Sequence, residues 1–577
     1  MKSPAFHLLL AVVLLQTPAG GDREPAGDRS GAPVFVDVTA RAGIGFVHQT
    51  GASGRRYFPE TMGGGVAFLD YDGDGDLDLY FPNGAPLPGY SQASEPANAL
   101  YGNDGGRFTE VEAAAGAGDP GGYGMGCAAA DYDNDGRLDL YVTNFGANAM
   151  FRNQGPGFAD VTAESALGDT AWGAGCAFFD YDNDGDLDLY ITNYVHFDFA
   201  SVDEDLDPYL KSTEKRPRKT GEKISAYPDP GQFPGAEDRL LRNDAGGAFA
   251  DVTGRSGMVD TVSIEGRGLG VVAVDYDRDG WPDLYVANDG SRNFLYRNLG
   301  GGSFEDVAGL AGVAYGLDGQ REAGMGVDAG DFDGDGSVDL VVTNFEQEPV
   351  SLYRNLGSGT FLHFSYPAGI GLPTLRPLSF GLGFFDYDND GFLDLFIANG
   401  HVLDNITRFD RSRTYGQANQ LLRNLGPDPA GVVRFEDVSD AAGEAVTAQM
   451  VSRGAAFGDF DEDGDTDLLV GNVGQRPNLL RNDRGGGNNW LKVKAAGRSS
   501  NRDGIGARVR IAAGDLRLVR EVRGSYSYLA HSDLRVSFGL GGRTAVDEVV
   551  VVWPSGLEDR VTGVEANRTI VVVEGGG

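Results

Sequence analysis

A nine-residue acidic segment occurs seven times in this 577-residue chain, and it limits the folds that the sequence can adopt. Every copy has Asp at positions 1, 3, 5 and 9 and Gly at position 6. Four carboxylates so close together repel one another unless a cation neutralises them. A hard divalent cation with oxygen ligands would do so, and Ca²⁺ fits best. The sequence therefore predicts up to seven calcium loops.

The predicted ligands are the side chains at positions 1, 3, 5 and 9. Position 7 varies in type, as expected if it offers only its backbone carbonyl. The residues concerned are Asp70, Asp72, Asp74, Asp76 and Asp78; Asp131, Asp133, Asp135, Arg137 and Asp139; Asp180, Asp182, Asp184, Asp186 and Asp188; Asp275, Asp277, Asp279, Trp281 and Asp283; Asp331, Asp333, Asp335, Ser337 and Asp339; Asp386, Asp388, Asp390, Phe392 and Asp394; and Asp459, Asp461, Asp463, Asp465 and Asp467.

Two other interpretations of these segments fit the residues less well. An EF-hand closes its loop with Glu at position 12, whereas here position 12 is apolar in all seven copies, from Phe81 to Val470. A strand-like run such as DLYVTN follows each loop instead. Simple acidic β-turns are the second alternative, but a turn needs one Asp rather than four. Calcium loops between β-strands are the preferred interpretation.

The rest of the repeat predicts four short strands per unit. A Gly precedes each loop by five residues, from Gly65 to Gly454, and an apolar run follows it. An apolar-Arg-Asn strand and a Phe-x-acid-Val strand follow the loop in most copies. The seventh unit lacks the last strand, and an extra FVDV occurs at Phe35. We therefore expect an all-β, seven-bladed β-propeller over residues 33–488, closed by its N-terminal strand.

These loops resemble the FG-GAP/VCBS repeats of integrin α-subunit propellers, with "TN" or "AN" where integrins have "GAP". Residues 489–577 resemble an ASPIC/UnbV domain in NWLKV, NRDGIGARV, FGLG and VVWPSG, and their alternating pattern predicts a small β-sandwich-like domain. Together they are similar to the cartilage acidic protein 1 family. The resemblance implies an extracellular calcium-binding protein in matrix or adhesive contexts, without established catalysis.

The N-terminus predicts export. Lys2 precedes an apolar run from Phe6 to Leu15, and small residues at Thr17 and Ala19 suit a cleavage site. We expect a signal peptide over residues 1–19, a linker over 20–32, and a secreted or periplasmic mature chain. An uncleaved anchor is the alternative, although the run is shorter than the ~20 residues that span a bilayer.

The charge of the chain limits the classes of partner, and its two cysteines limit the possible disulfides. The net charge is −38, which argues against nucleic acid. From residue 489 onward, 13 Lys and Arg face 10 Asp and Glu, so this part could dock on its own propeller, meet an anionic glycan or simply expose its arginines. Cys127 and Cys176 occupy equivalent repeat positions, as buried core residues or as an inter-blade disulfide.

The sequence offers candidate metal ligands but no recognised catalytic motif. Motifs for nucleophilic, zinc-dependent and phosphate chemistry are absent from the sequence, so we expect no enzyme. The main expectation is an extracellular binding or adhesion module with structural Ca²⁺ and an unknown protein or glycan partner. A lectin-like or polysaccharide-cleaving propeller is the alternative. Insertions at 84–97, 194–238 and 400–418 either carry specificity or are solvated loops.

Overall fold

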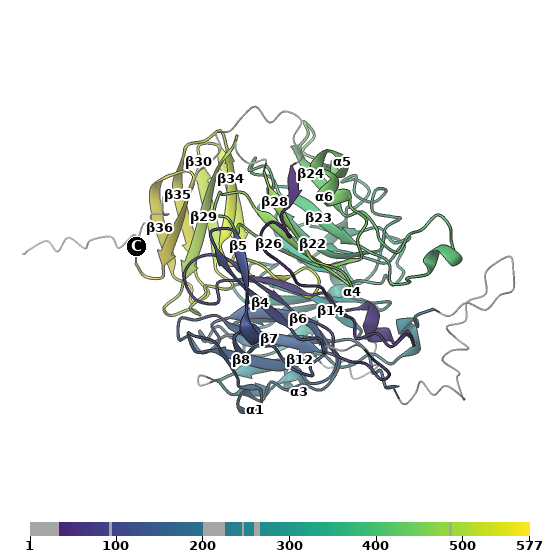
Figure 1. The fold of residues 1–577 in the computed structure, drawn as a ribbon. Helices are drawn as coiled ribbons and strands as arrows, with labels where there is room; N and C mark the ends of the chain where they lie inside the picture. The colour runs from purple at the N-terminus through teal and green to yellow at the C-terminus, as the bar shows by residue number, and fades with distance from the viewer. Residues whose placement is uncertain are drawn as a thin grey trace, which may run out of the picture.

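The computed structural model describes residues 34–91, 95–199, 226–244, 247–258, 266–483 and 487–576. The predicted signal peptide and linker, and residues 200–225 of the largest insertion, lie outside these ranges. The described chain is nearly all β, as predicted, with seven repeated sheets and a separate C-terminal pair of sheets (Figure 1). No helix in the described ranges has the length and apolar character needed to cross a membrane.

Each of the first six repeats contributes four antiparallel strands, in chain order, to one sheet. The strands are β2 (Val66–Leu69), β3 (Asp78–Phe81), β4 (Ala99–Asp104) and β5 (Arg107–Val111); β6 (Gly124–Ala130), β7 (Asp139–Asn144), β8 (Ala149–Asn153) and β9 (Phe158–Asp160); β10 (Gly173–Phe179), β11 (Asp188–Asn193), β12 (Arg239–Asn243) and β13 (Phe249–Asp251); β14 (Gly268–Val274), β15 (Asp283–Asn288), β16 (Phe294–Asn298) and β17 (Phe304–Asp306); β18 (Val327–Gly330), β19 (Asp339–Val342), β20 (Ser351–Asn355) and β21 (Phe361–His363); β22 (Ser379–Phe385), β23 (Asp394–Asn399), β24 (Gln420–Pro427) and β25 (Val433–Asp437).

The seventh sheet joins the two ends of the repeat region. It contains β26 (Ser452–Gly458), β27 (Asp467–Asn472) and β28 (Asn478–Asn482), and its fourth strand is β1 (Phe35–Asp37). Phe35 lies opposite Asn482 in this antiparallel pair. The first strands of successive sheets also contact one another in a closed series, from β2 through β6, β10, β14, β18, β22 and β26 back to β2. The sheets therefore form a ring of seven blades.

Short helices connect the blades. Four-residue α-helices follow the fourth strands of several blades, and 3₁₀ turns lie in the connections. They are α1 (Thr162–Ser165), α3 (Thr253–Ser256), α4 (Ala308–Ala311), α5 (Ser439–Ala442) and α6 (Glu444–Thr447), with η1 (Phe58–Thr61), η2 (Glu112–Gly116), η4 (Pro230–Gln232) and η5 (Ile406–Arg408).

The C-terminal domain is a two-sheet β-sandwich, drawn in yellow in Figure 1. Its apolar core includes Leu491, Phe538, Val549 and Trp553. One sheet contains β29 (Asn489–Ala496), β34 (Val536–Gly541) and β37 (Arg568–Val573), and the other contains β30 (Arg508–Ala513), β31 (Leu516–Glu521), β35 (Ala545–Val552) and β36 (Glu558–Glu565).

A segment of this domain enters the ring of blades. Between β31 and β34, β32 (Ser525–Tyr526) and β33 (Ala530–His531) extend the sheet of the first blade, with β33 parallel to β2. The glycine before the acidic loop makes room for it in five of the seven blades: a Cβ on Gly65, for example, would lie 2.6 Å from the carbonyl oxygen of Leu529. We call residues 525–531 the central segment. The two domains are thus consecutive in sequence but interleaved in space.

Candidate metal centres in the acidic loops

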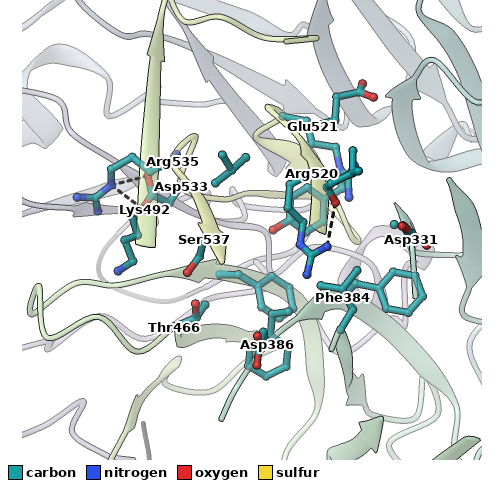
Figure 2. A pocket seen from close by; sticks show the side chains of 18 of the residues that line it. Asp331, Phe384, Asp386, Thr466, Lys492, Arg520, Glu521, Asp533, Arg535 and Ser537 are labelled. Carbon is teal, nitrogen blue, oxygen red and sulfur yellow. Dashed lines mark hydrogen bonds and ion pairs between the residues drawn. The ribbon is translucent and has the colours of Figure 1, made fainter. Parts of the chain in front are cut away.

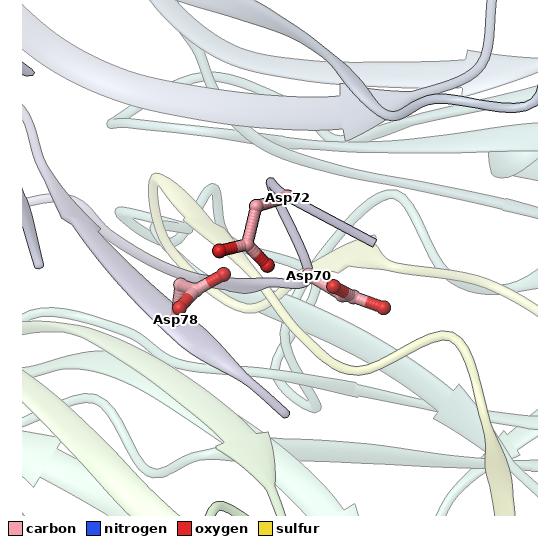
Figure 3. A group of neighbouring side chains, drawn as sticks. All are labelled: Asp70, Asp72 and Asp78. Atoms are coloured by element: carbon pink, nitrogen blue, oxygen red, sulfur yellow. The ribbon is translucent and has the colours of Figure 1, made fainter. Parts of the chain in front are cut away.

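All seven acidic segments lie between the first and second strands of a blade, and the aspartate at position 9 begins the second strand in every case. Figure 3 shows Asp70, Asp72 and Asp78 of the first loop with their carboxylates grouped together. A β-strand, rather than the second helix of an EF-hand, therefore follows each loop, as the sequence predicts.

The backbone of the loops explains the residues at positions 4 and 6. Both positions have positive φ in every loop, for example 58° at Asn134 and 93° at Gly136. Position 4 is Gly or Asn in five loops, residues that tolerate this conformation, whereas Arg278 and Glu462 adopt it in the other two. In each loop the position 7 N–H donates to the position 5 carboxylate, as from Arg137 to Asp135 at 3.0 Å. The main chain is thereby curled around the carboxylates.

Carboxylate oxygens from different loop positions converge closely enough to share an ion. In at least five loops, one oxygen from each of three aspartates lies within 4.8 Å of the others. The groups are Asp70, Asp72 and Asp78; Asp131, Asp133 and Asp139; Asp180, Asp182 and Asp184; Asp275, Asp277 and Asp279; and Asp331, Asp333 and Asp339. Of the predicted positions, 1 and 3 take part in all five groups, while positions 9 and 5 alternate as the third member.

Several of these oxygens are buried without a hydrogen-bond donor. At position 3, Oδ1 of Asp133, Asp182, Asp277 and Asp461 meets no donor among the described residues, and neither does Oδ2 of Asp139 at position 9. An unsatisfied buried acceptor costs about 1–3 kcal/mol, and more when it is charged. A bound cation would satisfy these oxygens. The loops therefore offer the carboxylate oxygens, with free lone pairs, that a divalent metal requires as ligands.

The raised pKa values of the loop aspartates also favour a bound cation. Burial raises the pKa of Asp78 and Asp139 to about 8, and neighbouring carboxylates add to the rise. Burial likewise raises the pKa of Asp386 at position 1 to about 8. A cation among these groups would favour their ionised forms and lower each pKa.

An asparagine on the third strand of every blade ties the loops into a ring, a role that the sequence analysis did not assign. Its N–H donates to the position 9 aspartate of its own blade, and its Nδ2 donates to the position 8 carbonyl. The same Nδ2 reaches the position 2 carbonyl of the preceding loop, as from Asn355 to Tyr276 at 3.0 Å. The seven residues are Asn103, Asn153, Asn243, Asn298, Asn355, Asn424 and Asn482.

The arginine beside that asparagine neutralises part of the loop charge in three blades. Arg297 Nε lies 2.7 Å from Asp277, and Arg423 Nη2 lies 3.0 Å from Asp388. Arg354 pairs with Asp333 in the same way. These arginines contact the carboxylates at positions 3 and 5, so part of the negative charge of these three loops is balanced by the protein itself.

The two cysteines have no part in these centres. Cys127 and Cys176 are both free and buried, so the disulfide that the sequence left open as an alternative is not formed. Burial raises the pKa of both thiols. They pack in the apolar clusters between neighbouring blades.

Comparison with known proteins agrees with this architecture. Residues 90–142, 131–191, 275–342 and 331–397 match the FG-GAP-like repeat, and residues 497–577 match the family described as ASPIC and UnbV. Cartilage acidic protein 1 of Mus musculus is 29% identical over 302 residues, which is 50% of this chain and 43% of that protein. The Homo sapiens protein is 28% identical over 302 residues, covering 50% of this chain and 42% of that protein.

The solved structures that match this chain are distant in sequence. A lectin of Agrocybe aegerita that recognises non-reducing terminal N-acetylglucosamine is 16% identical, with a TM-score of 0.36 over 72% of this chain and 87% of that one. BBS1N in complex with ARL6DN is 11% identical, with a TM-score of 0.39 over 78% of this chain and 98% of that one. The chain thus combines FG-GAP-like repeats with a C-terminal ASPIC and UnbV region, and it is homologous to cartilage acidic protein 1 over half of its length.

Proposed function

We propose that this protein is a secreted calcium-binding β-propeller that acts as an extracellular binding or adhesion module. The observation that carries the proposal is the set of buried carboxylate oxygens without donors in the acidic loops, at Asp133, Asp182, Asp277 and Asp461. Ca²⁺ accepts six to eight oxygen ligands at flexible geometry, which suits converging carboxylates and a backbone carbonyl. The ions would be structural, because each would hold a loop at the junction of two strands.

Homology and charge support the extracellular assignment. The relatives are named cartilage acidic protein 1, and the chain matches less than half of their length. The net charge of −38 suits a calcium-rich exterior, where weak sites with Kd of about 10⁻⁴–10⁻³ M stay filled. We treat the protein as a module without catalysis, since the loop carboxylates would be used as metal ligands.

The face away from the acidic loops is the proposed partner surface. Connections between second and third strands lie on the side of the ring opposite the loops, because successive antiparallel strands reverse direction. The described parts of the longer insertions belong to these connections. They contact neighbouring segments of the same face: Asp404 lies 2.8 Å from Arg56, which precedes β2, and Phe199 packs edge-on against Phe145, which follows β7, at 5.5 Å. A partner glycan or protein would meet aromatic side chains there.

Metal analysis tests the calcium proposal. We expect close to seven Ca²⁺ per chain and a rise in melting temperature that Mg²⁺ does not reproduce. Asp133→Asn should lower the stoichiometry by one, because it removes a carboxylate from the second loop. Asp440→Asn is the control, since Asp440 is exposed and lies outside the loops. Calcium-independent melting with no bound metal would refute the proposal. Glycan and matrix arrays, with an assay for new reducing ends, then separate binding from cleavage.

A further inference from the structure

The C-terminal domain covers the face of the propeller that carries the acidic loops. Hydrogen bonds or ion pairs join it to four of them. The contacts are Asp131 N to Asp503 Oδ2 at 2.7 Å in the second loop, Arg508 Nη2 to Gly336 O at 2.8 Å in the fifth, Gly541 N to Asn389 O at 2.9 Å in the sixth, and Lys492 to Asp459 in the seventh. Three of the four use backbone atoms of the loop, so they depend on the loop's curled main chain.

The remaining loops also meet this domain. Ser499 packs on the third loop so closely that a Cβ on Gly185 would lie 2.7 Å from its carbonyl oxygen. The backbone of Asp275 in the fourth loop lowers the pKa of Glu521 in this domain, against the larger effect of burial. Lys494 acts on Asp70 in the first loop through its charge, which lowers the pKa of that carboxyl against the larger effect of burial. The covered surface therefore includes parts of the candidate metal centres, while residues 72–75 of the first loop and 278–280 of the fourth remain exposed.

The charges across this interface are complementary. Figure 2 shows Arg520 of the C-terminal domain between Asp331 and Asp386 of the loops, with Lys492 and Arg535 of the same domain farther from both. They line a cavity of about 120 Å³ between the domains. The Lys492–Asp459 pair is almost completely buried, with exposed side-chain fractions of 2% and 0%. Undocking of the C-terminal domain would separate this pair, because Lys492 and Asp459 belong to different domains.

The central segment adds an apolar anchor to this interface. Tyr528 is fully buried and donates to the carbonyl of Met62 at 3.0 Å, and Leu529 is 4% exposed. Ser527 pairs with Val327 through both backbone bonds. Undocking the domain would expose the side chains of Tyr528 and Leu529 and the backbone of Ser527 to water. The central segment therefore leaves the ring only if all of these contacts are lost at once.

We propose that the C-terminal domain is a calcium-dependent cap, held on the propeller by the metal-loaded loops and released when the metal is removed. The inference rests on the proposed calcium binding. Without a cation, the carboxylates of each loop repel one another, the curled main chain opens, and the docking bonds to Gly336, Asn389 and Asp131 lose their geometry. By linkage, docking strengthens calcium binding by the same factor by which calcium strengthens docking.

Hydrogen exchange on the full chain tests the cap. In millimolar Ca²⁺ the amides of residues 525–531 should be protected. In chelator their exchange should accelerate at least tenfold, within the usual range of coupling between sites, while the strands β14–β16 stay protected. Equal protection of 525–531 with and without metal, in a protein that binds Ca²⁺, would overturn the cap and leave the calcium proposal intact. Simultaneous loss of protection in the blades would also overturn it, because no separate docking step would then exist.

Reciprocal variants test the linkage from the other side. Tyr528→Ala with Leu529→Ala weakens docking without touching a loop, and should weaken calcium binding measured by titration calorimetry about tenfold. Tyr528→Phe removes only the bond to Met62 and guards against a misfolded double variant; it should give a smaller change of the same sign. Leu557→Ala, at a site 48% exposed on the same domain, is the control and should change nothing. Unchanged affinity in both Tyr528 variants would contradict the linkage, whereas absence of calcium binding in the unaltered protein would refute the proposed function itself.

Discussion

The asparagine ring makes one prediction that needs no metal to be bound. Asn355 is 2% exposed, and its side chain donates to Tyr276 O at 3.0 Å and Val338 O at 2.9 Å and accepts from Gly357 N at 2.9 Å. Asn355→Ala removes these three bonds. At about 1 kcal/mol each, the substitution should destabilise the ring by about 3 kcal/mol.

The shift in melting temperature follows from the size of the propeller. An unfolding entropy of about 2.1 cal/mol/K per residue over roughly 450 residues gives about 1 kcal/mol/K, so the midpoint should fall by about 3 °C. Scanning calorimetry of the metal-free protein measures this shift. Ser358→Ala is the matched control, because it removes an exposed hydroxyl from the same hairpin. A midpoint for Asn355→Ala equal to that of Ser358→Ala would refute the reasoning that the amide links two blades.

Three other outcomes are expected. Burial raises the pKa of Asp78 and Asp139 to about 8, so the metal-free native protein holds protons that the unfolded chain releases. Its melting temperature should therefore fall as pH rises from about 4 to 8. A rise in the melting temperature of metal-stripped protein over that range would contradict this. The stabilisation by Ca²⁺ should grow over the same interval, because the metal competes with those protons. Gly65→Ala should lower stability and accelerate exchange of the central segment, since the new Cβ would lie 2.4 Å from Met125 O and 2.6 Å from Leu529 O, whereas Gly309→Ala, which meets nothing within 4 Å, should not.

The repeat pattern predicts the ring and its loops well because each signal is local. The nine-residue spacing places Asp139 at the first residue of β7, and the same holds in every blade. The Phe35 strand could be matched to the seventh blade because that repeat lacks a strand of its own. The spacing that recurs in all seven repeats therefore predicts the strand order, the type of loop and the candidate ligands.

Contacts between repeats were not predictable in the same way. Asn355 bonds to a carbonyl 79 residues earlier, and Asn103 bonds to Phe460, 357 residues away, so no local pattern marks either pair. The central segment contains Tyr528 and Leu529 in a run of ordinary strand residues. Its trace in the propeller sequence is the glycine before five of the seven loops, and a glycine there is equally typical of a turn or of a close approach by another segment.

The pairing of β1 with β28 has a consequence for how the chain folds. Val36 lies opposite Arg481, so the last blade cannot form until nearly the whole propeller has been synthesised. The central segment is made later still, and it bonds to Val66 and Ala67 near the start. Closing loops of this length costs conformational entropy and slows folding. A growing chain must therefore keep its first blade incomplete, with unpaired strand edges, until its final hundred residues or so emerge.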